Sequence, residues 1–399
     1  MWRLLRGGTF RWVWAGESVS MLGDHFHEIA LAWLVLTIGG SPLTLGAVLA
    51  AGAIPRAVLL LIGGATSDRL SARVLMLASN LTRAALVGLL VVLVMGGWVR
   101  LWQLYVIEVA FGVADAFFYP AVGSITAELV RKEELPSANA LVSTSEQVAM
   151  LAGPAVGGVL VATAGVAGAF LVNSLSFAVA AGGLLAARSL GRPARRSPGL
   201  LSDVKRGLAY AWSDRELRVV LLLVSAASLT YSGVFAVGLP GLARLRFPEG
   251  SIALGFMVGA SGLGQLAGVV SAGFTGLPRR WGVLIIGVAF CEGLGFIVLG
   301  LAPTFWAAAI VLALLGFGAA YASDVALPSW LQRRTAEGML GRVMSLVELP
   351  RRSLAPISFL AMGALAGYSL SVAFACAGAV MLAAALAAAG SRTVRELSC

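Results

Sequence analysis

The chain has 399 residues, of which 59% are hydrophobic and only 12% are charged, and its mean hydropathy is +0.91. Soluble proteins carry about 25% charged residues on average, so this composition excludes a soluble enzyme or a soluble nucleic-acid-binding protein. We therefore expect an integral membrane protein, in which the net charge of +10 has to be explained by the positions of the basic residues.

Long apolar runs follow one another along the chain, separated by clusters of glycine, proline and arginine. About 20 apolar residues in a helix cross the hydrocarbon core of a bilayer, and each run is long enough to do so. This pattern predicts an all-α protein with twelve transmembrane helices. The predicted spans are residues 12–37, 43–65, 74–97, 101–128, 138–163, 167–188, 217–241, 251–276, 281–301, 304–332, 340–365 and 369–390.

Arginine and lysine are distributed unequally between the loops. With the N-terminus placed in the cytoplasm, 22 of the 29 basic residues fall in cytoplasmic segments and only three, Arg100, Arg244 and Arg246, in outer loops. A positive excess on the cytoplasmic side is typical of membrane proteins. We therefore expect a multi-pass protein of the bacterial inner membrane with both termini in the cytoplasm. The basic excess does not indicate a nucleic-acid partner.

A single long polar stretch divides the chain near its middle. Its second part has an apolar stripe from Val204 to Trp212 and predicts a helix lying on the cytoplasmic membrane surface. The two halves of the chain also share a sequence pattern, since a Phe-Gly pair followed by proline occurs at Phe111 and again at Phe317. A parallel repeat of this kind is typical of secondary transporters. The predicted organisation is a six-helix lobe at 1–188, a linker at 189–216 and a second six-helix lobe at 217–399.

The loop after the second span reads Gly64-Ala-Thr-Ser-Asp68-Arg69-Leu-Ser-Ala-Arg73. It resembles the signature of the major facilitator superfamily at Gly64, Asp68, Arg69 and Arg73, while serine and alanine at positions 71 and 72 replace the usual glycine and arginine. The resemblance implies a cytoplasmic gate, in which this cluster locks one side of the transporter and lets it reopen. Ordinary arginine-rich loop chemistry is the alternative.

The fifth span contains Gly153-Pro154 followed by Gly157 and Gly158, with Ala149 four residues before the first glycine. This run looks like the antiporter motif of the same superfamily, whose carriers are mostly exporters. Proline removes a helix hydrogen bond and glycine permits close packing, so a plain packing kink is the alternative. Over the whole chain, the closest resemblance is to the macrolide-efflux and enterobactin-exporter branch, which does not identify the substrate.

Charged residues inside the predicted spans are costly in lipid and normally face a cavity or a partner. Glu17, Asp24 and Glu28 lie close to one stripe of the first helix, at 100° per residue. Carboxylates in a low-dielectric cavity can take up and release protons near neutral pH, although a structural role with arginine or serine partners is the alternative. Further candidates for proton coupling or for the substrate cavity are Arg83, Glu108, Asp115, Glu348 and Arg352.

These features predict a secondary active transporter that exports a bulky amphipathic small molecule, such as a drug, a macrolide or a siderophore-like compound. We expect alternating access by a monomer in the bilayer, with protons as the coupling ion. No nucleotide-binding or hydrolase motif occurs in the sequence, so we expect neither enzymatic activity nor a cofactor or resident metal. The alternatives are a lipid or lysophospholipid flippase of the same fold and, less favoured, a metal-ion exporter or a non-transporting membrane receptor.

Overall fold

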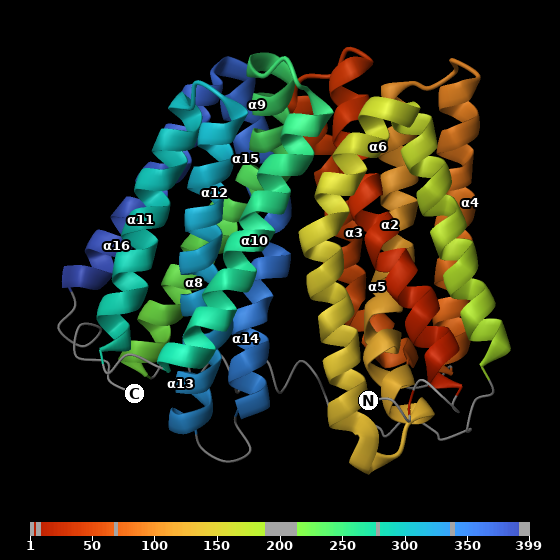
Figure 1. Cartoon of the computed structure of the whole chain (residues 1–399), viewed down its shortest axis with the longest axis horizontal. Helices are drawn as coiled ribbons and strands as arrows, with labels where there is room; N and C mark the ends of the chain where they lie inside the picture. The colour runs from red at the N-terminus through yellow and green to blue at the C-terminus, as the bar shows by residue number, and fades with distance from the viewer. Residues whose placement is uncertain are drawn as a thin grey trace. The chain divides into compact units, whose positions relative to one another are not determined.

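The computed structural model describes residue 4 and residues 9–67, 71–187, 214–276, 280–335 and 340–390. Within these ranges the regular structure is helical and contains no strand (Figure 1). Asp68 and Arg69 of the predicted gate and the predicted surface helix ending at Trp212 lie outside the described residues.

The first part of the chain forms five long helices and one short 3-10 turn. The 52-residue α6 is interrupted at Gly165, whose φ of 72° and ψ of 175° are not helical. A positive φ is accessible to glycine without steric cost, and Figure 1 shows the two limbs of α6, yellow and yellow-green, running in opposite directions. The elements are α2 (Phe10–Thr37), α3 (Pro42–Ser67), α4 (Ala72–Met95), α5 (Leu101–Leu129), η1 (Lys132–Glu134) and α6 (Leu135–Ala186).

The second part contains further helices, two of them joined to the next through a π-helical turn. These turns, η2 and η3, each widen the helix for a few residues, a feature that is rare and frequent at functional sites. The elements are α8 (Arg215–Gly233), η2 (Val234–Gly238), α9 (Leu239–Arg246), α10 (Ser251–Thr275), α11 (Trp281–Leu301), α12 (Phe305–Ala319), η3 (Ala320–Ala326), α13 (Leu327–Arg334), α14 (Leu340–Ser353), α15 (Ala355–Tyr368) and α16 (Leu370–Gly390).

The predicted seventh span, which ended at residue 241 with Arg244 and Arg246 in an outer loop, is shorter than the helix that the structure shows, since α9 continues to Arg246. The reason is that the Arg246 guanidinium donates hydrogen bonds to the carbonyl oxygen of Gly300 at 2.7 Å and to the hydroxyl of Ser371 at 3.1 Å. These hydrogen bonds stabilise a charged side chain that the hydropathy pattern had placed in an aqueous loop.

Nine helical stretches of the described residues are long and apolar enough to cross a membrane. Their outer faces carry large exposed apolar side chains, such as Val92 on α4 and Leu175 on α6. Such faces would be unfavourable in water and are what lipid-facing helices require. The protein is therefore an all-helical membrane protein.

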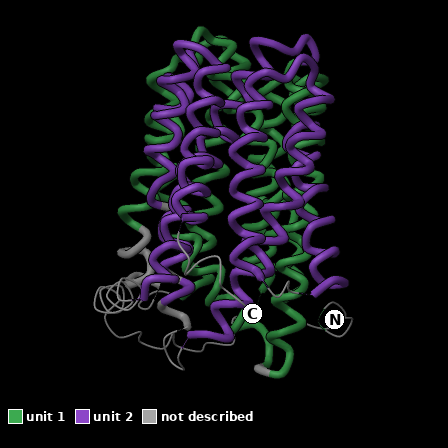
Figure 2. The backbone as a smooth tube through the Cα atoms, turned by 90° about the vertical axis from the view of Figure 1, so that its left-hand side faces the viewer, with its two compact units in different colours: residues 1–40, 48–198, 250–255 green, residues 41–47, 199–249, 256–399 purple. Residues whose placement is uncertain are grey.

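Two compact units divide the chain and are coloured in Figure 2. Unit 1 comprises residues 1–40, 48–198 and 250–255, and unit 2 comprises residues 41–47, 199–249 and 256–399. In unit 1, α2 and α4 both pack along α6, and glycines allow close approach: a Cβ atom at Gly16 would lie 2.9 Å from the Cα atom of Ala180. In unit 2, α11 packs along α16, and α8 packs on α14, α15 and α16.

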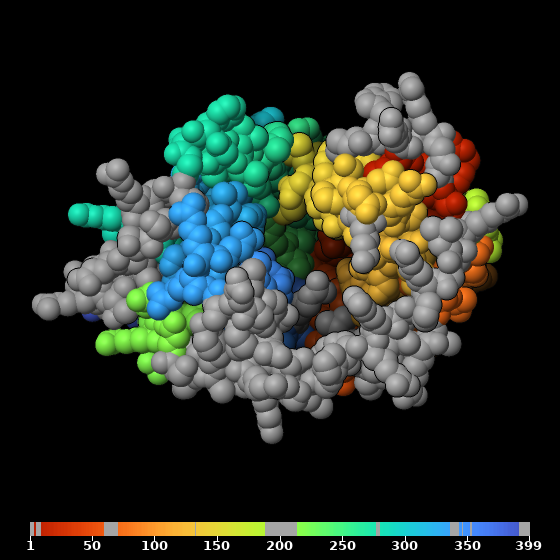
Figure 3. Space-filling view, turned by 90° about the horizontal axis from the view of Figure 1, so that it is seen from below, coloured from red at the N-terminus to blue at the C-terminus, as the bar shows by residue number. Residues whose placement is uncertain are grey.

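An ion-pair cluster joins two elements of unit 2 on the face seen in Figure 3. There α13, in light blue, lies beside the start of α8, in lime green. Arg334 at the end of α13 has Nη2 3.0 Å from Oδ2 of Asp214, the N-cap residue of α8, and also pairs with Glu216. The cluster ties the last turn of α13 to the first turn of α8.

Candidate functional site

The centre of the candidate site is Asp115 on α5, which lies between two guanidiniums in unit 1. Arg83 on α4 places Nη1 3.4 Å from Oδ1 of Asp115, and Arg56 on α3 places Nη2 3.0 Å from Oδ2. Asp115 is 3% exposed and Arg83 is 2% exposed. Two positive partners therefore compensate one buried carboxylate, which is the condition for keeping such a charge inside a protein.

Aromatic rings enclose the Arg83 guanidinium. Its central carbon lies 3.9 Å from the ring centroid of Phe118 on α5 and 4.5 Å from that of Phe177 on α6. The electron-rich ring faces attract the cation and exclude water from it. Arg83 is thus held by packing as well as by charge, which a flexible lysine would not reproduce.

The contacts continue from Arg83 to the first helix. Arg83 Nη2 donates to Oδ1 of Asn80 at 2.5 Å, and Asn80 Nδ2 donates to Oε1 of Glu17 at 2.9 Å. Glu17, Asn80, Arg83, Asp115 and Arg56 therefore form one connected network, which we call the buried polar chain. Four helices contribute to it: α2, α3, α4 and α5.

Asn80 was missed in the sequence interpretation, although it links two of the predicted residues. The available signal was its position three residues before Arg83 on the same helix, where side chains share a face. A single uncharged amide such as Asn80 does not stand out in an apolar run as a charged residue does.

The three predicted carboxylates of the first helix have different surroundings. Glu17 is buried in the polar chain, whereas the Glu28 side chain is 69% exposed and pairs with His25 at 3.1 Å. Asp24 is partly buried, and its Oδ1 atom is shielded from solvent without a hydrogen-bond partner among the described residues. The structure therefore brings Glu17 into contact with Asn80, leaves Glu28 at the surface and gives Asp24 an incompletely satisfied position.

Glu108 forms a second buried pair, with His27. His27 Nε2 lies 3.2 Å from Oε1 of Glu108, and the ring of Phe111 stacks on the imidazole at 5.0 Å with an interplanar angle of 9°. The sequence interpretation selected Glu108 but did not predict this partner. Its signal was weak, because the sequence does not show which neighbouring helix His27 faces.

The predicted antiporter motif forms a packing surface in α6. Gly153 lies against the side chain of His25, and Gly157 lies against Phe26. A Cβ atom at Gly158 would approach the Cα atom of Gly255 to 2.9 Å. The helix continues through Pro154, and its non-helical residue is Gly165. The motif thus allows close helix contacts along α6.

Of the predicted gate residues, Gly64 lies in α3 and Arg73 lies in α4. Arg73 Nε donates to the carbonyl oxygen of Leu184 at 2.8 Å, and its Nη2 donates to that of Leu185 at 2.9 Å. The last carbonyls of a helix have no partner within the helix, so Arg73 caps the end of α6.

Unit 2 holds other ionisable residues. Glu348 pairs with Arg351 at 3.1 Å on the surface of α14, and nothing is described for the side chain of Arg352. Glu292 on α11 is buried and accepts a hydrogen bond from the Tyr231 hydroxyl at 3.0 Å. Unit 2 therefore has no network among its described residues comparable with the buried polar chain. No cluster of three histidine, cysteine or carboxylate side chains suited to a metal occurs in the described part of either unit.

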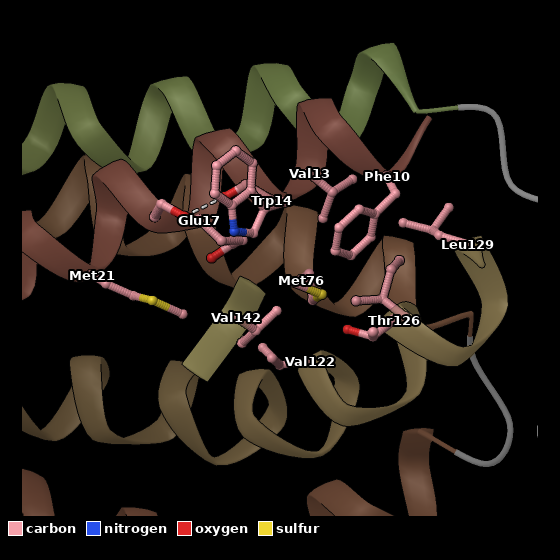
Figure 4. A pocket seen from close by; sticks show the side chains of 12 residues that line it. Phe10, Val13, Trp14, Glu17, Met21, Met76, Val122, Thr126, Leu129 and Val142 are labelled. Carbon is pink, nitrogen blue, oxygen red and sulfur yellow. Dashed lines mark hydrogen bonds between the residues drawn. The ribbon is translucent and has the colours of Figure 1, made fainter. Parts of the chain in front are cut away.

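A small cavity adjoins the polar chain in unit 1 (Figure 4). Its volume is about 30 Å³, and Phe10, Val13 and Glu17 from α2 line it together with Met76 from α4. This volume is sufficient for about one water molecule. A more open groove of about 240 Å³ between α2 and α6 shares Trp14 and Ser18 with the cavity. Glu17 thus borders a narrow space that lies next to a wider one.

Known proteins resemble the chain over nearly its whole length. A family model described as "Transmembrane secretion effector" matches residues 1–397. Macrolide efflux protein A of Streptococcus pyogenes is 22% identical over 350 residues, covering 86% of this chain and 85% of the relative. Multidrug efflux pump Tap of Mycolicibacterium fortuitum is 26% identical over 368 residues, covering 86% of each chain. The crystal structure of the POT family transporter PepTSo has a TM-score of 0.76 at 14% identity, covering 98% of this chain and 99% of that one, which shows a shared fold.

Proposed function

The chain belongs to the transmembrane secretion effector family of the major facilitator superfamily, and from this premise we propose that it exports a bulky amphipathic small molecule in exchange for protons. Members of this family are membrane transporters, so the chain is not an enzyme. Efflux is the direction stated in the names of both relatives described above, one for macrolides and one for several drugs.

The proposed architecture is twelve transmembrane crossings in two six-helix lobes with both termini in the cytoplasm. The two limbs of α6 would be the fifth and sixth crossings, and α8 to α9, α12 to α13 and α14 to α15 would each be one crossing. The positive excess of the cytoplasmic segments supports this orientation in a bacterial inner membrane. We propose a monomer, since one chain would supply both lobes.

The observation that carries the proton-coupling proposal is the position of Asp24. Asp115 has two guanidinium partners, Glu17 has Asn80 and Glu108 has His27, whereas the buried Oδ1 atom of Asp24 has no hydrogen-bond partner among the described residues. Leaving a buried carboxylate oxygen unpaired is costly. Such a group can exchange its charge for a proton when the helices around it move, which is what a coupling residue has to do.

The test uses purified protein in proteoliposomes with an imposed pH gradient and erythromycin as the first substrate of a drug panel. Asp24→Asn keeps the shape of the side chain but cannot bind and release a proton, so we expect gradient-driven efflux to be lost while substrate binding persists. Glu133→Gln, in the exposed η1 turn, is the matched control and should transport normally. Undiminished gradient-driven efflux by Asp24→Asn would reject Asp24 as the coupling residue.

The same vesicles distinguish the alternative of a flippase. A lipid transporter of this fold would leave the drug panel unaffected and would change the sidedness of a fluorescent phospholipid. Movement of lipid without movement of any drug would overturn the proposal of drug export.

A further inference from the structure

The His27–Glu108 pair lies in the interior of unit 1 and is screened from water by aromatic rings. His27 is 6% exposed and Glu108 is 5% exposed. The rings of Phe111 and Phe170 have their centroids 5.0 and 5.4 Å from that of the imidazole. The contact between His27 and Glu108 is therefore shielded, and it joins α2 to α5.

The backbone of α3 and an unpaired ring nitrogen complete the surroundings of the pair. On α3, a Cβ atom at Gly52 would lie 3.0 Å from Oε2 of Glu108, so the backbone of α3 packs directly on the carboxylate. His27 Nδ1 is buried and has no hydrogen-bond partner among the described residues. The Nε2 atom thus contacts Glu108, whereas Nδ1 can bind or release a proton without breaking a hydrogen bond among the described residues.

The charges of this region do not balance without added protons. Three buried carboxylates and Asp24, whose Oδ1 atom is buried, belong to the same region as two guanidiniums, so the carboxylates outnumber the guanidiniums by two. Both guanidiniums are already committed to Asp115. An uncompensated buried charge is strongly unfavourable, so protons have to supply the difference. The four carboxylates are Glu17, Asp24, Glu108 and Asp115, and the two guanidiniums are Arg56 and Arg83.

We infer that the His27–Glu108 pair is a second proton-binding site, separate from Asp24, so that unit 1 exchanges two protons in each transport cycle. With Nε2–H donating to the Glu108 carboxylate, one added proton on His27 Nδ1 changes the pair from a net charge of −1 to zero. Its release restores the neutral imidazole and the carboxylate. The inference rests on the proposed proton-coupled export and adds to it a site and a stoichiometry.

Other charged groups interact with this pair and influence its affinity for a proton. Asp24 and Glu28 belong to the same helix as His27, Asp115 belongs to the helix of Glu108, and Arg56 on α3 interacts electrostatically with Glu108. From α6 the contacting group is the uncharged ring of Phe170. Movement of α3, which carries Arg56 and packs on Glu108 through Gly52, would therefore change the affinity of the pair for its proton.

The first experiment needs no substrate. The chain contains two histidines, His25 and His27, so protein labelled with ¹⁵N in its histidine rings gives two imidazole signals by NMR, and His25→Gln leaves only that of His27. We expect the His27 ring to change between imidazole and imidazolium between about pH 5 and 8, the range in which histidines commonly titrate. Glu108→Gln should displace that transition. A His27 ring that keeps one neutral tautomer over this range, in both proteins, would overturn the inference.

The second experiment counts protons. In proteoliposomes, the pH gradient that just balances a known erythromycin gradient gives the number of protons exchanged for each drug molecule. We expect this number to fall from two in the wild type to one in both His27→Gln and Glu108→Gln, and to stay at two in His25→Gln, whose imidazole belongs to the more exposed His25–Glu28 pair. An unchanged number in His27→Gln and Glu108→Gln would overturn the inference.

The two experiments fail in different ways. If the wild type moves erythromycin without any dependence on the pH gradient, the proposed antiport is wrong, and the NMR titration still decides whether the pair binds a proton. If the wild type is proton-driven and His27 does not titrate, the proposed antiport stands and the second proton site is rejected.

Discussion

Arg83 and Asp115 meet in the interior of unit 1, with Nη1 and Oδ1 3.4 Å apart, although they lie on different helices and are 32 residues apart in the sequence. Arg56 approaches the same carboxylate from a third helix at 3.0 Å. Because each guanidinium takes one oxygen, Asp115 holds α3 and α4 to α5 at a single point. A change in the charge or the position of Asp115 would therefore reach both neighbouring helices.

Removing the Arg83 guanidinium should destabilise unit 1. Arg83→Met would leave Asp115 with one cation and the Oδ1 atom of Asn80 without its donor, and loss of one partner of a buried pair costs about 3–5 kcal/mol of unfolding free energy. Arg83→Lys keeps the charge but loses the planar stacking, so we expect an intermediate loss. Thermal unfolding in detergent measures the effect, with Arg333→Met on the exposed end of α13 as the control. Equal midpoints for Arg83→Met and Arg333→Met would contradict a structural role for Arg83.

Glu17 and Asn80 should be energetically coupled. Their hydrogen bond of 2.9 Å is buried, and each single substitution, Glu17→Gln or Asn80→Ala, changes the same contact. A double-mutant cycle should therefore yield an interaction of about 0.5–3 kcal/mol, the range for residues in one network. Additive effects within about 0.3–0.5 kcal/mol, as expected for distant sites, would show that the two residues act separately.

Two glycines of α6 should respond oppositely to alanine. At Gly158 a Cβ atom would lie 2.9 Å from the Cα atom of Gly255, whereas at Gly182 no atom of another helix lies within 4 Å of it. We expect Gly158→Ala to cost about 1–3 kcal/mol through overpacking, and Gly182→Ala to be neutral or to gain up to about 1 kcal/mol from helix propensity. Unfolding in detergent compares the two variants. A stabilising Gly158→Ala would reject the close contact.

Loss of the Arg73 cap should loosen the end of α6. Arg73→Ala removes two hydrogen bonds to the carbonyls of Leu184 and Leu185, each worth about 1 kcal/mol. Hydrogen exchange of the peptide covering residues 176–187 should therefore become faster. Arg131→Ala, which removes an exposed guanidinium, is the control. Unchanged exchange in Arg73→Ala would leave this arginine with the gate role alone.

The helices were largely predictable from the sequence because the bilayer imposes one simple requirement on each of them. A span needs about 20 apolar residues in succession, so hydropathy located α11 at its observed ends, Trp281 and Leu301. Arg246 shows the limit of this reasoning. Its charge indicated a loop, yet local carbonyl partners allow the helix to continue. The resemblance to the major facilitator superfamily, which the loop after the second span indicated, is confirmed by the family match.

The candidate site was predictable by residue and only in part by partner. Embedded charges are rare, so Glu17, Arg83 and Asp115 were recognisable in apolar runs. Which of them meet depends on how helices pack, and a single sequence contains no measure of that packing. The contacts of Asn80 and His27 were not predicted for a related reason, since they exist only once a neighbouring helix brings Glu17 or Glu108 within hydrogen-bond distance.

The π-helical turn η2 has a consequence for how related sequences can vary. Each residue turns a helix by about 100°, so the wider turn sets the rotational phase of α9 relative to α8. Deleting a single residue such as Ala236 would rotate everything after it by about that angle and would swing Arg246 away from the Gly300 carbonyl to which it donates. We therefore expect the number of residues between Tyr231 and Arg246 to vary little. Insertions and deletions in relatives should fall outside this interval.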